Sequence, residues 1–454
     1  MTGNRDMTTG GVLRAILLFA VPLFLDNILQ QVYSLVDTMI VGYNLGDAAI
    51  AAIGCTTPLF DLLITFASGL NNGFAVPIAN AYGERDMAKI RASILAVLWL
   101  DVAIALLATA AGLLGVRGLL GLLNVPEALM GQATRYIVIV MAGYGVTMLF
   151  NMFSAILRAV GDSRTPLLFV GIAFACNIVL DLALVAGAGM GVAGAALGTV
   201  ISQLISVALC ARHVWTRYAE LIPRRSDAKA SRERVAPMLK AGMSMGIMYS
   251  VLCVGGMVLQ SAVNLLGETV IAAHTAARKL VMLFMQPMMS VSTANTMFIG
   301  QNWGAGKVAR IREGVRKVAL AELLWAGFAI AFVFAFGRTA VRLMTNTSDR
   351  EMLANAAMNL RINFIFYLPL GLLLCLRTTM QAMGSYALPV ILSGVELLIK
   401  IAGAYLIVPR FDYRGASFVE PSSWVICGAI IVVAFMTGTR KKLSGVAIVG
   451  KTGE

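Results

Sequence analysis

Long apolar segments recur along the whole chain of 454 residues and constrain its fold more than any other feature. The run from Gly191 to Ala211 contains no charged residue, and the run from Val318 to Gly337 contains one, Glu322. A helix needs roughly 20 mostly apolar residues to cross a bilayer. Charged residues make up 13% of this chain, against about 25% in soluble domains. The sequence therefore predicts an all-α membrane protein.

We expect about twelve membrane-spanning helices, because that many apolar segments are long enough to cross. The predicted spans are residues 12–43, 48–80, 90–116, 132–158, 164–186, 191–213, 237–264, 269–302, 313–336, 353–382, 388–409 and 414–438. Their apolar runs are continuous rather than alternating, which excludes a β-barrel. The first segment is predicted to be a span rather than a signal peptide, since it is too long and contains Pro22, Asp26 and Asp37.

The net charge of +13 is spread unevenly over the loops. With the N-terminus placed inside, most of the 36 Lys and Arg residues fall on inner loops and tails. These inner segments are the residues up to Arg14, 84–91, 158–164, 212–240, 307–317, Arg377 and 440–451. Such a bias follows the positive-inside rule, so we expect both termini in the cytoplasm. It also accounts for the basic charge without a nucleic-acid partner.

The two halves of the sequence resemble each other. The matching segments are Leu45-Gly46-Asp47 with Leu266-Gly267-Glu268 and Tyr82-Gly83 with Trp303-Gly304, at an offset of 221, and Arg158-Ala159-Val160-Gly161 with Gln381-Ala382-Met383-Gly384, at an offset of 223. Each half then holds an even number of spans, so the halves are parallel repeats. We predict an N-lobe over residues 1–215, a basic cytoplasmic linker over 216–236 and a C-lobe over 237–454. These lobes would be two six-helix bundles, related by a pseudo-two-fold axis, around a central cleft.

Ionisable residues inside the predicted spans are the candidate functional groups, because a charge at membrane depth costs roughly 2.5–3.5 kcal/mol. Asp37 lies in the first span, and Asn177 and Asp181 lie one helical turn apart in the fifth. A carboxylate beside an amide can bind a cation or, when buried, hold a proton. The alternatives are a structural hydrogen-bonded pair and an Asp37 hydrated near the outer surface.

Several other charged residues in the spans have roles that the sequence leaves open. Asp26 shares the first span with Asp37, and Asp61 and Asp101 are either interfacial or functional. Glu396 and Lys400 stand at i and i+4, a spacing that predicts a neutralising ion pair. A role of this pair in substrate or proton handling is the alternative.

Motifs for other functions are missing from the sequence. It has no phosphate-binding glycine loop for ATP, no catalytic His-Cys or Ser-His set and no metalloprotease signature. The 2 histidines are too few for a metal site, and the 6 cysteines lie in apolar segments without paired spacing. We therefore expect a protein that is not an enzyme, has no cofactor and draws its energy from an ion gradient.

The chain resembles the MATE family of multidrug and toxic compound extrusion transporters over nearly its full length. The segments that carry this resemblance are Pro22, Gln30 to Thr38, Val41-Gly42, Leu45-Gly46, Ile50-Ala51-Ala52, Asn151, Leu157 to Asp162, Pro166, Asn177 to Asp181, Gln301 to Gly306 and Gln381 to Gly384. The resemblance implies an exporter of organic, often cationic and amphipathic, compounds in exchange for H⁺ or Na⁺. It further implies a monomeric, multi-pass protein of the cell membrane, with small organic substrates and membrane lipid as its partners.

Asp37, Asn177 and Asp181 look like the cation-coupling site in the N-lobe of the DinF-like branch of that family, where Na⁺ or H⁺ would bind. Supporting polar groups are implied at Tyr136, Asn151 and Thr199. The NorM-like branch places acids in its seventh and tenth spans, and this sequence has none there. The resemblance therefore favours a mechanism centred on the N-lobe.

A third set of residues is predicted to contact substrate. Its members are Gln31, Gln260, Met282, Met285, Met289 and Glu396. Flexible thioether side chains suit varied apolar substrates, although packing in the core is the alternative. Two rival functions are a lipid-linked precursor flippase, which needs more cationic residues than Arg278, Lys279 and Lys400, and an uncoupled channel or receptor.

Overall fold

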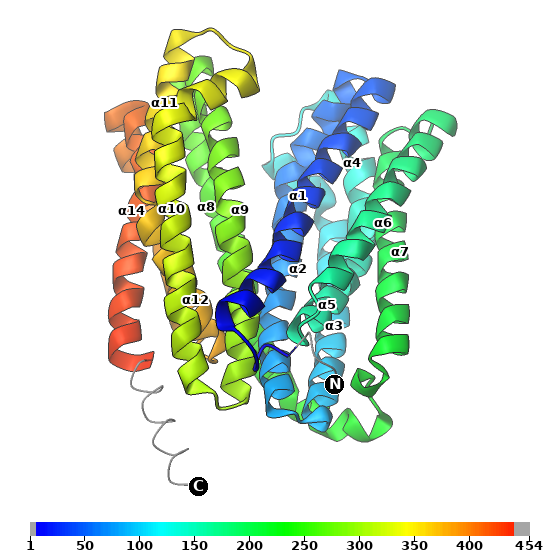
Figure 1. Cartoon of the computed structure of the whole chain (residues 1–454). Helices are drawn as coiled ribbons and strands as arrows, with labels where there is room; N and C mark the ends of the chain where they lie inside the picture. The colour runs from blue at the N-terminus through cyan, green and yellow to red at the C-terminus, as the bar shows by residue number, and fades with distance from the viewer. Residues whose placement is uncertain (1–5, 440–454) are drawn as a thin grey trace. The chain divides into compact units, whose positions relative to one another are not determined.

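A computed structural model describes residues 6–439, which form helices and turns with no strand among them (Figure 1). The helices of the first half are α1 (Val12–Leu45), α2 (Asp47–Glu84), α3 (Met87–Leu122), α4 (Glu127–Ala142), α5 (Tyr144–Ala159), α6 (Arg164–Asp181) and α7 (Val192–Arg217). Those of the second half are α8 (Ala228–Val263), α9 (Glu268–Gly304), α10 (Val308–Thr345), α11 (Arg350–Ile365), α12 (Tyr367–Ala382), α13 (Ala387–Ala402) and α14 (Val408–Ala434). The all-α fold predicted from the sequence is confirmed.

The chain divides into two compact units, for which we keep the names N-lobe and C-lobe. The N-lobe contains Asp6 and Val21–Gly246, and the C-lobe contains Met7–Ala20 and the described residues from Ile247 onward. The start of α1 thus belongs to the C-lobe, and the division falls just before Pro22. Helix α8 begins at Ala228, inside the predicted linker 216–236, and stays with the N-lobe as far as Gly246.

The twelve predicted spans agree with these helices. By length and composition, 8 helical stretches could each cross a membrane, and 10 if each bent pair counts as one span. The bent pairs are α4 with α5, at 44°, and α11 with α12, at 47°. Helix α9 falls outside this count but packs among α10, α11 and α12. The 52-residue stretch Ala387–Gly438 is too long for one crossing of about 30 Å, and it breaks at Asp412 with φ 48°.

Glycines at matching positions set the same turns in both halves. Gly46 precedes α2 with φ 77°, and Gly267 precedes α9 with φ 96°. Gly161 and Gly384, which follow α5 and α12, have φ 93° and 77°. Positive φ strains residues that carry a Cβ atom, so these positions favour glycine. The glycines repeated in the sequence therefore mark repeated backbone turns.

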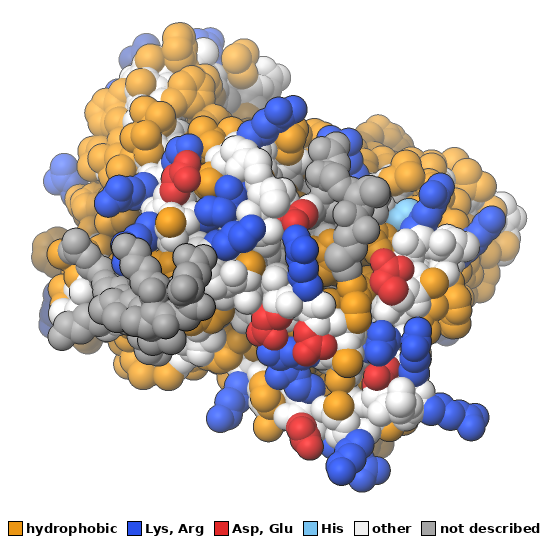
Figure 2. Space-filling view, turned by 60° about the horizontal axis from the view of Figure 1, so that its bottom comes forward, with side chains coloured by type: hydrophobic (Ala, Val, Ile, Leu, Met, Phe, Trp, Pro, Cys, Tyr) orange, Lys and Arg blue, Asp and Glu red, His pale blue; other side chains and the backbone are white. Residues whose placement is uncertain are grey.

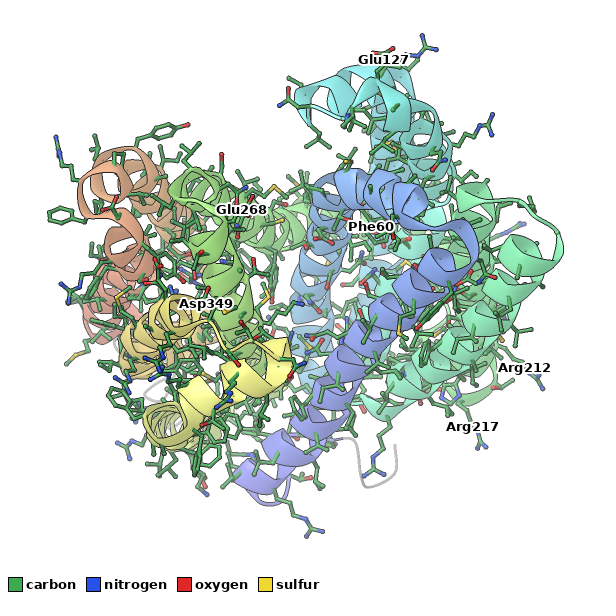
Figure 3. All side chains as sticks on the ribbon, turned by 90° about the horizontal axis from the view of Figure 1, so that it is seen from above. Phe60, Glu127, Arg212, Arg217, Glu268 and Asp349 are labelled. Atoms are coloured by element: carbon green, nitrogen blue, oxygen red, sulfur yellow. The ribbon has the colours of Figure 1, made fainter. Side chains whose placement is uncertain are left out.

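In the N-lobe, charged side chains gather at the end that carries the α2–α3 and α7–α8 connections (Figure 2). Arg212 and Arg217, near the end of α7, are exposed and point outward in Figure 3. Two arginines that the sequence assigned to inner loops lie inside helices instead. Arg158 is buried in α5, and Arg377 is buried in α12, because each has a polar partner inside its lobe.

The first described residues are bound by side chains of α9 and α10. The Asn302 side-chain amide donates to the backbone oxygen of Met7 at 3.1 Å, and the Lys307 ammonium donates to that of Thr8 at 2.9 Å. The Arg310 guanidinium donates to the oxygens of Thr9 and Gly10 at 3.0 and 2.8 Å. These bonds explain why Met7–Ala20 belong to the C-lobe.

Candidate functional site

Two carboxyl groups meet inside the N-lobe. Asp37 comes from the C-terminal half of α1, and Asp181 is the last residue of α6. Their carboxyl groups lie within interaction distance of each other, and Asp181 is fully buried. Two ionised carboxylates have only acceptor atoms, so a hydrogen bond between them requires a proton. The structure thus brings together two acids that lie 144 positions apart in the sequence.

Polar atoms around this acid pair lack hydrogen-bond partners. Within residues 6–439, both carboxylate oxygens of Asp181, Oδ1 of Asp37 and both amide atoms of Asn177 are buried without one. The Tyr33 hydroxyl is also unpaired there, although it lies beside Thr199 and Ser202 of α7. A buried polar atom without a partner costs about 1–3 kcal/mol. This cluster is therefore suited to hold a small cation, a proton or water.

Glycine and a π-helical turn shape the space at Asp181. A Cβ atom added at Gly198 of α7 would clash with Oδ1 of Asp181. Only a glycine therefore leaves this carboxylate oxygen accessible from α7. Directly after Asp181, the chain forms the π-helical turn Leu182–Gly187, a feature that frequently occurs at functional sites.

The other residues predicted for the N-lobe site divide into two groups. Tyr136 of α4 is buried near Asp37, Asp181 and Asp61, so the structure places it at the cluster. Thr199 is also there, beside Tyr33. Asn151 instead donates to the backbone oxygen of Thr147 at 2.9 Å, and no contact recorded for the described residues joins it to the acid pair.

Asp61 and Asp101 occupy different environments. Asp61 of α2 is exposed but lies near Tyr136. Asp101 of α3 is fully buried, and it accepts a hydrogen bond of 3.2 Å from Asn71. At the repeat offset of 221, the C-lobe places Glu322, which accepts a bond of 2.8 Å from Ser292. The two lobes thus bury an equivalent acid against an equivalent polar residue.

In the C-lobe, the prediction that Glu396 pairs with Lys400 is wrong. Glu396 of α13 forms a buried ion pair with Arg377 of α12 at 3.3 Å. Lys400 forms an ion pair with Glu420 of α14 at 3.0 Å. The sequence spacing suggested a pair along one helix, but a partner on the neighbouring helix lies closer to each charge. Arg278 of α9 also contacts Glu420, at 3.4 Å.

The C-lobe residues predicted to contact substrate lie in different surroundings. Met285 and Met289 pack against the C-lobe core, which favours the packing interpretation, whereas Met282 is half-exposed. Gln260 donates to Asn264 at 2.8 Å, one turn along the chain. Gln31 is exposed on α1, and Glu396 is occupied by Arg377.

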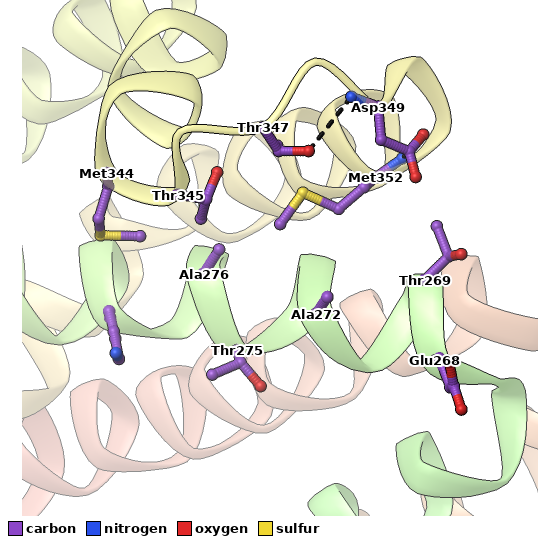
Figure 4. Close-up of a pocket in the computed structure, with 11 residues that line it drawn as sticks. Glu268, Thr269, Ala272, Thr275, Ala276, Met344, Thr345, Thr347, Asp349 and Met352 are labelled. Atoms are coloured by element: carbon purple, nitrogen blue, oxygen red, sulfur yellow. Dashed lines mark hydrogen bonds between the residues drawn. The ribbon is translucent and has the colours of Figure 1, made fainter.

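A pocket lies in the C-lobe where the start of α9 faces the connection from α10 to α11 (Figure 4). Its volume is about 580 Å³, and none of the residues predicted to contact substrate lines it. Asp349, on its wall, accepts hydrogen bonds from the backbone of Glu351 and Met352 and so caps α11. This carboxylate therefore has a structural role.

Several residues of these clusters were not predicted from the sequence. Tyr33, Gly198 and Ser202 belong to the N-lobe cluster, and Glu420 belongs to the C-lobe cluster. Glu420 carried a usable signal, because it is an acid within a predicted span. Gly198 carried none, since its role depends on the packing of α6 against α7.

Comparisons with known proteins agree with the repeat and the fold. The sequence profile of the family described as MatE matches residues 22–183 and again residues 245–406. The same profile thus matches both halves at an offset of 223, which confirms the internal duplication. These two matches together cover more than half of the chain.

Individual relatives extend this similarity to most of the chain. The probable multidrug resistance protein YpnP of Bacillus subtilis (strain 168) is 29% identical over 344 residues, which cover 76% of this chain and 77% of YpnP. The probable multidrug resistance protein YoeA of the same organism is 27% identical over 398 residues, 85% of this chain and 86% of YoeA. A crystal structure of MATE in the bent conformation superposes with a TM-score of 0.90 at 22% identity and covers 99% of both chains.

Proposed function

The chain belongs to the MatE family of membrane transporters, and we propose that it exports organic compounds in exchange for H⁺ or Na⁺. The names of its relatives, probable multidrug resistance proteins, support the export of drug-like molecules. The expected substrates are organic, often cationic and amphipathic. The expected site of action is the cell membrane, which the chain would cross many times as a monomer with both termini in the cytoplasm.

The observation that carries this proposal is the acid pair of Asp37 and Asp181. Their buried carboxylate oxygens lack hydrogen-bond partners among the described residues, and the amide of Asn177 beside them also lacks one. Both H⁺ and Na⁺ would satisfy these atoms, since Na⁺ binds carboxylate, amide and hydroxyl oxygens. Tyr33 and Thr199 would then supply hydroxyl groups at the edge of the ion site.

A mechanism follows from the charge of this cluster. Without a bound cation, two carboxylates face each other in a buried site and repel. Binding of a cation removes this repulsion and lets α1 and α6 pack more closely. If the substrate binds less tightly to the repacked state, ion binding on the outside releases it there. The ion can shift the equilibrium only by its difference in affinity for the two states.

The rival function as a lipid-linked precursor flippase receives less support. A pyrophosphate group needs several cationic side chains that are available for binding. In the C-lobe, however, Arg278 and Lys400 both contact Glu420, and Arg377 contacts Glu396. These ion pairs leave too little uncompensated positive charge for a pyrophosphate.

The test is dye efflux from proteoliposomes under an imposed pH gradient and, separately, an imposed Na⁺ gradient. We expect one gradient to drive efflux by wild type and the Asp181→Asn variant to lose this response, because an amide neither holds the proton nor attracts the cation. The matched control is Asp47→Asn, which removes an exposed carboxylate from the first turn of α2.

The results of this experiment distinguish a wrong coupling site from a wrong function. Efflux that persists unchanged in Asp181→Asn would place ion coupling outside the N-lobe cluster. If neither gradient drives the dye through wild type, the export function is wrong for this substrate class, and scrambling of a lipid-linked substrate becomes the next measurement.

A further inference from the structure

The C-lobe contains a cluster of charged side chains at positions equivalent to the N-lobe site. At the offset of 223, Asn177 corresponds to Lys400. At the offset of 221, Gly191 corresponds to Asp412, and both have nearly the same backbone conformation, with φ 63° and ψ −145° against φ 48° and ψ −141°. Thr199 therefore corresponds to Glu420.

Two cations share one carboxylate in this cluster. The Lys400 ammonium lies 3.0 Å and the Arg278 guanidinium 3.4 Å from the same oxygen, Oε1 of Glu420. Lys400 is buried, and Glu396, one turn before it, is already paired with Arg377. The cluster therefore holds one positive charge that no described carboxylate balances. An unbalanced charge in a membrane interior is unfavourable, and an anion would compensate it.

The neighbouring helices make room for these cations. A Cβ atom added at Gly255 of α8 would lie 2.7 Å from Cδ of Lys400, and one added at Gly256 would lie 2.8 Å from a guanidinium nitrogen of Arg278. Two adjacent glycines thus let both side chains cross the surface of α8.

A small cavity adjoins Arg278 and Glu420 of the cluster, and Lys400 is not among the residues that line it. It is lined by Arg278, Glu420, His274, Asn359 and Asn363, among others. His274 is buried, and its Nε2 atom has no hydrogen-bond partner within the described part of the chain. The cavity's volume of about 10 Å³ is far below the roughly 300–1,000 Å³ of pockets for whole organic ligands and is about the space that one water molecule needs. It suits a small ion or one functional group.

We propose that this cluster is a binding site for a small monovalent anion, either a halide ion or the carboxylate group of an organic molecule. Arg278 and Lys400 supply the charge, and the unpaired nitrogen of His274 supplies a hydrogen-bond donor in the tautomer that carries the proton on Nε2. Glu420 holds the two cations in place and limits the affinity for the anion by competing for them. Asn359 and Asn363 of α11 also line the cavity.

Thermal unfolding of the purified, detergent-solubilised protein tests this proposal. Sodium chloride and sodium acetate are titrated separately at constant ionic strength. A bound anion raises the unfolding midpoint, and we expect a saturable rise of about 2–4 °C. A rise with chloride alone would identify a halide site, and a rise with acetate as well would show that the site accepts organic carboxylates.

Two variants of the cluster are expected to respond in opposite directions. Lys400→Met leaves Arg278 and Glu420 as a neutral pair, so the anion-dependent rise should disappear. Glu420→Gln removes the competing carboxylate, so the rise should become larger and saturate at lower anion concentration. The control is Lys279→Met, which removes a neighbouring charge of α9 that lines the other C-lobe pocket and should leave the rise unchanged.

The proposal is overturned if wild type shows no dependence on either anion, or if Lys400→Met responds like wild type. A Glu420→Gln variant that folds with an unchanged response would also contradict it. Because this measurement requires no transport, its result is independent of the coupling proposed for the N-lobe.

Discussion

The two lobes present the same backbone with opposite chemistry at equivalent positions. In the N-lobe, Asp37, Asn177 and Asp181 gather acidic and polar atoms that lack partners among the described residues. In the C-lobe, the positions of Asp37 and Asp181 are Val258 and Ala404, and that of Asn177 is Lys400.

Both lobes place a π-helical turn after this region, Leu182–Gly187 in one and Gly403–Ile407 in the other. A duplicated scaffold thus carries an unsatisfied acidic site in one copy and an ion-paired site in the other. The difference teaches that the backbone sets where a site can form, while a few side chains set which charge it accepts.

The largest expected effect comes from breaking a C-lobe ion pair. Arg377→Met leaves Glu396 as an unpaired charge that is only 3% exposed. We expect the free energy of unfolding to fall by about 3–5 kcal/mol, the cost of removing one partner of a buried pair. Unfolding in a denaturing detergent measures this change. The double variant Arg377→Met/Glu396→Leu should recover most of the loss, and a single variant as stable as wild type would show that this pair is not structural.

In the N-lobe, by contrast, the expected effect is on transport rather than on stability. Gly198→Ala places a methyl group against Oδ1 of Asp181. We expect ion-driven efflux to fall by roughly tenfold, within the usual range of coupling between two sites. Gly54→Ala is the matched control, because its added methyl group meets no atom within 4 Å. Normal efflux in Gly198→Ala would mean that the ion does not approach Asp181 from the α7 side.

A smaller effect is expected for the hydroxyl groups beside the acid pair. Tyr33→Phe removes a hydroxyl that would bind the ion or the protonated acid. The loss of one such hydrogen bond should raise the ion concentration for half-maximal efflux by about two- to tenfold. Tyr43→Phe serves as the control, since Tyr43 lies on the same helix but is 85% exposed. An equal change in both variants would indicate an indirect effect.

The smallest effect is expected at the acids buried equivalently in both lobes. Asp101→Asn and Glu322→Gln keep a side-chain oxygen in place to accept the bonds from Asn71 and Ser292. We expect efflux to remain within about twofold of wild type, because an intact hydrogen bond changes the free energy little. A loss of efflux in Asp101→Asn alone would extend the ion site from Asp181 to α3.

Much of the fold was predictable from the sequence because a membrane imposes a strong requirement on length and polarity. The apolar runs gave the spans, and the offsets between glycine-containing segments gave the duplication. The kinks that separate α4 from α5 and α11 from α12 carry no such signal, so each pair was predicted as a single span.

The candidate site was predictable only where chemistry was local. Asn177 and Asp181 lie one turn apart, so their neighbourhood followed from helical spacing. The ion-pair partner of Glu396 could not be predicted in this way. Helical spacing favoured Lys400, but in the folded C-lobe the partner is Arg377 of the neighbouring helix α12. Gly198 matters because the absence of a side chain leaves room for the Asp181 carboxylate, and no sequence pattern indicates this contact.

The attachment of the first described residues to α9 and α10 has a consequence for synthesis of the protein. The residues that bind the backbone of Met7 and Thr8 lie 295 and 299 positions later in the chain. At about 5–20 residues per second, a ribosome needs roughly 15–60 s to make that length. During this interval the N-lobe helices are already in the membrane, while the start of α1 still lacks the side chains that hold it. Assembly of the C-lobe therefore needs residues made both before and after the N-lobe helices, so an interruption of translation between them would leave it incomplete.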